Sequence, residues 1–231
     1  MKLGGLQKMT LLDFPGKVAC TVFTQGCNFR CPFCHNSSLV LSPELPELSQ
    51  EAFFAFLRKR QGLLDGVAIT GGEPLLHPDM PELLEKIRAL GYAVKLDTNG
   101  AFPARLEEIL KAGLADYVAM DIKNSREKYE RTAGVGGILP AVERSVELLM
   151  GGSTPFEFRT TLVDELHEPE DFAAIGRWIA GTERYFIQGF VDSGDILAGS
   201  EAYHAASPEK AKACLEAIRP WVPVAQLRGV E

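Results

Sequence analysis

Three cysteines lie close together in the segment FTQGCNFRCPFCHN, residues 23 to 36. Cys27, Cys31 and Cys34 follow the spacing Cys-x3-Cys-x2-Cys, and the chain has two further cysteines, Cys20 and Cys214, outside this segment. Closely spaced thiolates are typical ligands of metal ions and of iron–sulfur clusters. The segment is therefore a candidate metal centre, and the number of its thiols limits the kind of metal group that it suits.

A zinc ion and an iron–sulfur cluster make different demands on this segment. Structural zinc takes four ligands, usually from two spaced pairs, but a second Cys-x2-Cys pair is absent and His35 directly follows Cys34. Cys20 lies in an expected strand and Cys214 on the apolar side of an expected helix, so we expect both in the core. Three thiolates suit a [4Fe–4S] cluster better, because the fourth iron stays open to a small molecule.

Polar motifs follow three of the apolar, β-branched runs: TGGEP (70–74), KLDTNG (95–100) and AMDIK (119–123). The two glycines of the first motif allow a ligand to approach the backbone, and Glu73 offers a carboxylate suited to an ammonium group. Each motif alone is also compatible with an ordinary turn. Asp121 and Lys123 share one strand face, as do Glu157 and Arg159 in a later run. Such charges must be paired or face a polar cavity.

These motifs need strands and helices to bring them together. Alternating runs predict six strands, at 17–25, 66–70, 92–97, 116–123, 156–163 and 184–190. Amphipathic runs predict six helices, at 49–62, 79–91, 103–113, 140–151, 169–181 and 207–220. Strands that alternate with helices pair in parallel. The chain is therefore predicted to be α/β, either an open partial barrel or a doubly wound sheet, with its polar residues at the C-terminal ends of the strands.

Several smaller expectations follow from the sequence. We expect a single domain over 1–231, with a core over about 17–190 and a helix and edge strand over 207–229. The tail 221–229 could pair with residues 3–12.

Local patterns add two further expectations. Asp79 and Glu82 resemble a capping box at the start of the second helix. His167 and His204 lie in polar stretches and are expected at the surface.

Composition excludes some classes of function. The net charge is −7, which argues against binding to nucleic acid, because phosphate neutralisation needs a basic surface. The first residues lack the long apolar run of a signal peptide or a membrane span, so a cytoplasmic protein without a membrane partner is expected. In that compartment the cysteines are expected to be reduced thiols rather than disulfides.

The motifs CNFRCPFC, GGEP, LDTNG and MDIK, in this order on successive strand ends, resemble those of the radical S-adenosylmethionine (SAM) superfamily. The cysteine spacing is the signature of that superfamily, and an aromatic residue before the third cysteine is typical. Longer stretches such as TVFTQGCNFRCPFCHN and GLLDGVAITGGEPLL are similar to the glycyl-radical activases. The resemblance extends over nearly the whole chain. It implies a partial (β/α)6 TIM-like barrel of parallel strands that is open on one side.

The resemblance also implies roles for individual residues. Cys27, Cys31 and Cys34 would hold the [4Fe–4S] cluster, whose open iron chelates SAM. The positions that match SAM contacts are Phe33 and His35 at the adenine, Gly71, Gly72 and Glu73 at the methionyl amino group, and Asp121 and Lys123. Asp97, Thr98 and Asp121 match a monovalent-cation site of the pyruvate formate-lyase activase. Gln188 stands in the region where that relative has a histidine.

The implied reaction is a one-electron reduction of the sulfonium of SAM, with homolysis of the S–C5′ bond. The products are methionine and a 5′-deoxyadenosyl radical, which abstracts a Cα hydrogen from a glycine of a partner protein. The expected partner is anaerobic ribonucleoside-triphosphate reductase, and the expected electron donor is flavodoxin-like. Three alternatives are an activase of the pyruvate formate-lyase type, a radical SAM enzyme that acts on a small molecule, and a non-catalytic zinc-binding adaptor.

Overall fold

A computed structural model describes residues 1–41, 47–192, 194, 196–199 and 201–230. Its eight strands form one sheet in chain order: β1 (Leu3–Thr10), β2 (Ala19–Thr24), β3 (Gly66–Gly71), β4 (Ala93–Thr98), β5 (Tyr117–Asp121), β6 (Phe156–Leu162), β7 (Tyr185–Gly189) and β8 (Gln226–Arg228). The first pair, β1 and β2, is antiparallel, and every later pair is parallel. The sheet is not closed, since β1 and β8 form its two edges. This confirms the expected α/β fold, a partial TIM-like barrel open on one side.

The six predicted strands are present as β2 to β7, each within two residues of its expected ends. The predicted pairing of residues 221–229 with 3–12 is wrong, because β8 pairs in parallel with β7 and β1 pairs with β2 at the opposite edge. A short link joins β1 to β2, and consecutive strands joined in this way pair as an antiparallel hairpin.

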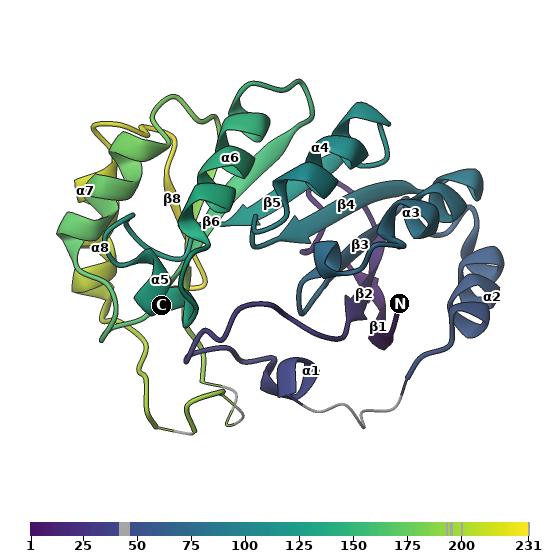
Figure 1. Ribbon diagram of the computed structural model, residues 1–231, viewed down its shortest axis with the longest axis horizontal. Helices are drawn as coiled ribbons and strands as arrows, with labels where there is room; N and C mark the ends of the chain where they lie inside the picture. Colours follow the sequence, from purple (N-terminus) through teal and green to yellow (C-terminus); the bar gives the residue numbers. More distant parts are fainter. Residues whose placement is uncertain (42–46, 193, 195, 200, 231) are drawn as a thin grey trace.

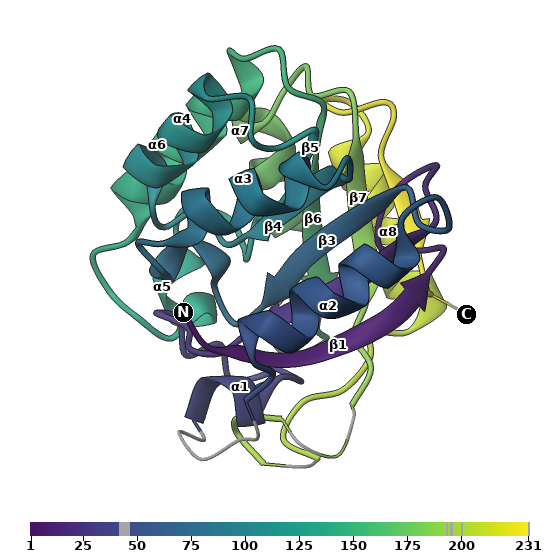
Figure 2. The ribbon, with the colours of Figure 1, turned by 90° about the vertical axis from the view of Figure 1, so that its right-hand side faces the viewer.

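The helices are α1 (Ser37–Leu41), α2 (Gln50–Arg60), η1 (Pro74–Leu76), α3 (Met80–Ala89), α4 (Pro103–Lys111), α5 (Tyr129–Ala133), α6 (Leu139–Met150), α7 (Pro169–Trp178) and α8 (Pro208–Ile218). The six predicted helices are all present, and the short α1, η1 and α5 were not predicted. Figure 1 shows α3, α4 and α6 on one side of the sheet and the link from β2 to α1 on the other. Figure 2 shows β1 running along the edge beside α2. Among the described helices, none is both long and apolar enough to cross a membrane.

Apolar side chains on the helices seal the outer face of the sheet. Leu83, Leu84 and Ile87 of α3 are at most 2% exposed, and each such side chain contributes about 1.5–3 kcal/mol when it is buried. Cys20 and Cys214 are completely buried, which confirms that they are core residues.

The predicted capping box of α3 is wrong. The Asp79 side chain makes no bond to its own helix, and its carboxylate instead accepts a hydrogen bond from the amino group of Met1 at 2.9 Å. The amino group is the stronger donor because it is charged. The start of α2 does follow its pattern, since the Ser49 side chain accepts from the backbone N–H of Ala52.

Candidate metal and cofactor site

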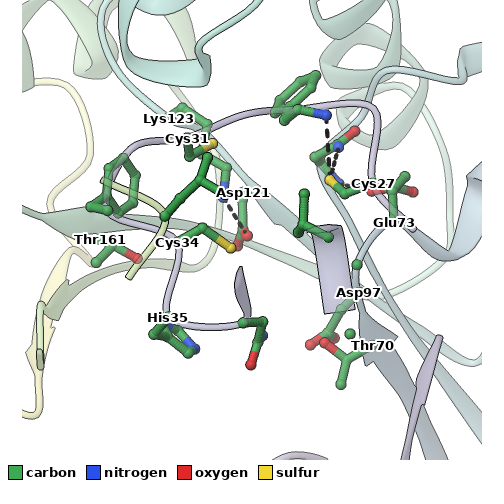
Figure 3. Close-up of a pocket in the computed structure, with 18 of the residues that line it drawn as sticks. Cys27, Cys31, Cys34, His35, Thr70, Glu73, Asp97, Asp121, Lys123 and Thr161 are labelled. Atoms are coloured by element: carbon green, nitrogen blue, oxygen red, sulfur yellow. Dashed lines mark hydrogen bonds and ion pairs between the residues drawn. The ribbon is translucent and has the colours of Figure 1, made fainter. Parts of the chain in front are cut away.

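A cavity of about 270 Å³ lies at the C-terminal ends of the parallel strands (Figure 3). It is lined by every residue that the sequence analysis assigned to the site, from the cysteine segment through the strand-end motifs to Gln188 on β7. The lining also contains polar residues that were not assigned: Arg30, Asn36, Thr70, Asn99, Arg159 and Thr161. Parallel strands explain this convergence, because their carboxyl ends meet at one edge of the sheet.

The cysteine segment links β2 to α1 and borders the cavity. The sulfur atoms of Cys27, Cys31 and Cys34 lie around one central space in Figure 3. In the part of the chain that the structure describes, no three His, Cys, Asp or Glu side chains converge as the ligands of one metal ion would. A four-iron cluster is larger than a single ion, so three thiols spread around one cavity fit a cluster better than they fit zinc.

Burial keeps the thiols of Cys27 and Cys31 protonated. It raises the pKa of Cys27 to about 11, although the backbone N–H of Phe29 donates to its Sγ at 3.3 Å. It raises the pKa of Cys31 to about 12. Iron is bound by thiolates and not by thiols, so the segment must release protons when it binds a metal group. The positive charge of the iron supplies the stabilisation that the protein alone does not give these thiolates.

Two distant parts of the chain hold the cysteine segment in place. The N–H of Arg30 donates to the carbonyl of Ala133 at 2.9 Å, and the N–H of Leu197 donates to the carbonyl of Cys34 at 3.2 Å. Gly134 permits the first contact, because a Cβ at this position would lie 2.1 Å from the carbonyl oxygen of Arg30. Backbone hydrogen bonds on both sides fix where the thiols can point.

Gly71 and Gly72 seat the end of β3 against the start of the cysteine segment. Gly71 has a φ of +111°, and a Cβ on Gly72 would lie 2.0 Å from the carbonyl oxygen of Gly26. The N–H of Gly72 donates to the carbonyl of Thr24 at 2.9 Å. Glycine is therefore required at these positions because the backbone of β3 approaches that of the cysteine segment closely. The sequence analysis did not identify this structural role. The role of the two glycines toward the amino group of SAM stays a prediction.

Glu73 is completely buried and links the ends of β3 and β4. Its Oε1 accepts from the N–H of Leu75 at 2.9 Å and from the hydroxyl of Thr98 at 2.8 Å, and its Oε2 accepts from the N–H of Asn99 at 2.7 Å. Burial raises the pKa of this carboxyl to about 7, against the lowering effect of these three donors. Both oxygens are engaged within the chain, so Glu73 orders the cavity wall whether or not it also meets a ligand.

We expect Glu73→Gln to remove a pH dependence of folding stability. A folded-state pKa of about 7, raised from 4.5, gives a stabilisation that is complete below pH 4.5 and is lost as pH rises through about 7. The difference in unfolding free energy between the natural chain and the variant should therefore fall by about 3 kcal/mol over that interval. Urea unfolding of the cluster-free chain at several pH values measures it.

Glu216→Gln, at an exposed position on α8, is the matched control and should show almost no such dependence. If the difference in unfolding free energy between the natural chain and Glu73→Gln stays constant from pH 4.5 to 8, the raised pKa of Glu73 is contradicted.

A network of charged side chains crosses the cavity wall from β4 to β6. Arg159 donates to Asp97 at 3.2 Å and to Asp121 at 3.0 Å, while Lys123 donates to Asp121 at 3.0 Å and Lys95 pairs with Asp97. This confirms that the charges on these strand faces are paired. Burial alone would raise the pKa of Asp121, but Arg159 and Lys123 hold it well below its usual range. Arg159 was not assigned to the site, although its place on a polar strand face was visible in the sequence.

His167 is buried, so its predicted surface position is wrong, whereas His204 is exposed as expected. The Nε2 of His167 lies 2.8 Å from the carbonyl oxygen of Lys123, and its Nδ1 lies 3.2 Å from the N–H of Val163. The stretch around His167 is polar in sequence, but it turns back beneath the end of β5. Burial lowers the pKa of His167, so the neutral ring donates to the carbonyl of a cavity residue.

The Phe33 ring closes one side of the cavity, and Phe190 supports it from behind. Phe33 is 5% exposed and packs edge-on against Phe190, with ring centroids 6.4 Å apart. His35 is exposed and lines the cavity, as does Gln188. The sequence analysis missed Phe190, which follows directly after β7. The predicted contacts of Phe33, His35 and Gln188 with SAM stay predictions.

Comparison with known sequences gives a family match. A family model described as the radical SAM superfamily matches residues 21–173. A protein of Methanocaldococcus jannaschii, provisionally named a glycyl-radical enzyme activating enzyme, is 32% identical over 196 residues, which are 81% of this chain and 79% of that protein. The pyruvate formate-lyase-activating enzyme of Clostridium pasteurianum is 34% identical over 128 residues, which are 53% of this chain and 52% of that enzyme.

Solved structures agree on the fold. Streptococcus suis SuiB bound to S-adenosylmethionine has a TM-score of 0.69 at 13% identity and covers 89% of this chain. The enzyme anSMEcpe with bound AdoMet has a TM-score of 0.65 at 17% identity and covers 85% of this chain. The chain spans only 49% and 58% of these two proteins, respectively.

Proposed function

This chain belongs to the radical SAM superfamily and resembles its glycyl-radical activases, and from that premise we propose that it generates a glycyl radical on anaerobic ribonucleoside-triphosphate reductase. One observation carries the proposal: a single segment presents three thiols, without a fourth, to a cavity lined by the polar ends of successive strands. The similarity to a provisionally named activase over 81% of the chain supports the same class of activity.

The residues of the cavity have separate tasks in this proposal. Cys27, Cys31 and Cys34 would hold a [4Fe–4S] cluster, which when bound supplies the electron for reductive cleavage of SAM. Asp121 and Lys123 would orient SAM at the wall of the cavity. The Phe33 ring, which packs against Phe190, would exclude water from one side of the cavity and so protect a radical from side reactions. A general acid or base is not required, since no proton is transferred in the cleavage.

An activase for a pyruvate formate-lyase-type enzyme is the second candidate. It is favoured by 34% identity to the Clostridium pasteurianum enzyme over 128 residues. Both candidates need the same cluster and the same use of SAM, so only the partner protein distinguishes them.

We expect the anaerobically reconstituted protein, once reduced, to convert SAM to 5′-deoxyadenosine and to produce a glycyl-radical doublet in EPR with anaerobic ribonucleoside-triphosphate reductase. Pyruvate formate-lyase should give no doublet in a parallel sample. A flavodoxin as reductant tests the expected electron donor in the same assay.

Other outcomes have clear meanings. A doublet with pyruvate formate-lyase alone would establish the second candidate. Cleavage of SAM without a doublet on either partner would overturn both activase assignments. Zinc without iron or sulfide after anaerobic purification would contradict the cluster itself.

A further inference from the structure

The residues that match a monovalent-cation site are already occupied by other groups of the chain. The Oδ1 of Asp97 pairs with Lys95 and its Oδ2 with Arg159. The Oδ1 of Asp121 pairs with Arg159 and its Oδ2 with Lys123. Within the described part of the chain, each of these four carboxylate oxygens therefore has a cationic partner. The residues do not fit a Na⁺ or K⁺ site.

The hydroxyl of Thr98 is occupied as well. It donates to Oε1 of Glu73 at 2.8 Å and accepts from the N–H of Gly100 at 3.1 Å. A bound cation would need oxygen lone pairs that point toward it, and one of the two lone pairs of this hydroxyl already accepts from the turn that follows β4.

Lys95 differs from the other cations that pair with Asp97 and Asp121. Its side chain is only 2% exposed, and it points from β4 toward Asp97, two residues further along the same strand face. A buried ammonium cannot be left without a counter-charge, and the carboxylate of Asp97 supplies it. The lysine therefore lies in the interior of the protein, while its partner Asp97 lines the cavity. A metal cation at Asp97 would have to share that carboxylate with a positive charge a few ångströms away.

We propose that the Lys95 ammonium takes the place of a monovalent cation in this site, so that the protein binds SAM and folds without bound Na⁺ or K⁺. With Arg159 and Lys123, it sets three fixed positive charges against the two carboxylates of Asp97 and Asp121. Arg159 and Lys123 line the cavity, and such cations suit the carboxylate of an amino-acid substrate such as SAM. Only this last step rests on the proposed function.

The first test compares the reconstituted natural protein in NaCl, KCl and choline chloride at equal ionic strength. The melting temperature and the affinity for SAM should be the same in all three salts, and the ²³Na NMR line should show no saturable broadening. If the protein did bind the cation, a free cation concentration one hundred times the Kd would raise the melting temperature by roughly 5–10 °C. Such a rise, or saturable ²³Na broadening, overturns the proposal. The cation measurements do not depend on SAM cleavage, so they stand even if the proposed function fails.

The second test uses Lys95→Met, which keeps the apolar stem and removes the charge. We expect the variant to lose stability in choline chloride and to regain it in NaCl or KCl, with a melting temperature roughly 5–10 °C higher in the metal salts. Lys111→Met, at a lysine that is 74% exposed, is the matched control and should show no salt preference. A Lys95→Met protein that is equally stable in all three salts overturns the role of Lys95. If this variant does not fold, the comparison of salts on the natural protein still decides whether a cation is bound.

Discussion

Replacing Cys31 by alanine is expected to abolish cluster binding and SAM cleavage, whereas replacing Cys214 by alanine should leave both in place. Cys31 lines the cavity with the other two thiols of its segment, and Cys214 is completely buried in α8. A cluster held by two thiolates in place of three has two irons without a protein ligand. The rate of 5′-deoxyadenosine formation should fall by on the order of 1,000-fold or more, as for removal of a reacting group.

Iron and sulfide analysis after anaerobic reconstitution gives the primary measurement. The Cys214→Ala variant is the matched control, because it removes the same chemical group from a position away from the cavity. It should reconstitute normally and lose only about 1 kcal/mol of folding stability from the small cavity created. Full iron and sulfide content in the Cys31→Ala protein would show that the segment does not hold the cluster in the proposed way.

Gly72→Ala is expected to disrupt the site through the backbone alone. The added Cβ would lie 2.0 Å from the carbonyl oxygen of Gly26, so the cysteine segment or the end of β3 has to move. Neither is the flexible end of a side chain, and both carry the hydrogen bonds that join them. We expect a loss of about 3 kcal/mol or more in unfolding free energy, together with poor cluster incorporation.

Gly136→Ala provides the control for this substitution. Gly136 is exposed, and the nearest atom to an added Cβ is a carboxylate oxygen of Glu130 at 3.6 Å, so its stability should change by less than about 0.5 kcal/mol. Urea unfolding and iron analysis of both variants measure the effect. If Gly72→Ala incorporates the cluster as well as Gly136→Ala does, the close approach of β3 to the cysteine segment is not needed to hold the thiols.

The sequence was informative wherever a strong local pattern decided the structure. The strands β2 to β7 show β-branched runs, and the longer helices between them have clear start or stop signals, so the parallel core could be predicted. The convergence of the motifs also followed, because the ends of parallel strands must meet. For the same reason, every predicted site residue lines the same cavity.

Other features depend on contacts between distant residues and leave no local signal. β1 pairs with β2 because a short link joins the two strands, and no pattern within residues 3–12 themselves reveals this partner. His167 is buried because its loop folds back beneath β5, although its neighbours in sequence are polar. Glu73 was predicted to meet an ammonium group, yet its carboxylate accepts three hydrogen bonds from the chain itself.

The contacts that hold the cysteine segment set an order of events during synthesis of the chain. The thiols are made early, but Cys31 faces the carbonyl of Ala133, 102 residues later, and Cys34 accepts from Leu197, which is 163 residues beyond it (197 − 34). A ribosome adds about 5–20 residues per second, so these partners emerge many seconds after the cysteines. Such non-local contacts also form slowly once the partners are available. The three thiols therefore remain unprotected until most of the chain has been made, and iron delivery is expected to follow translation.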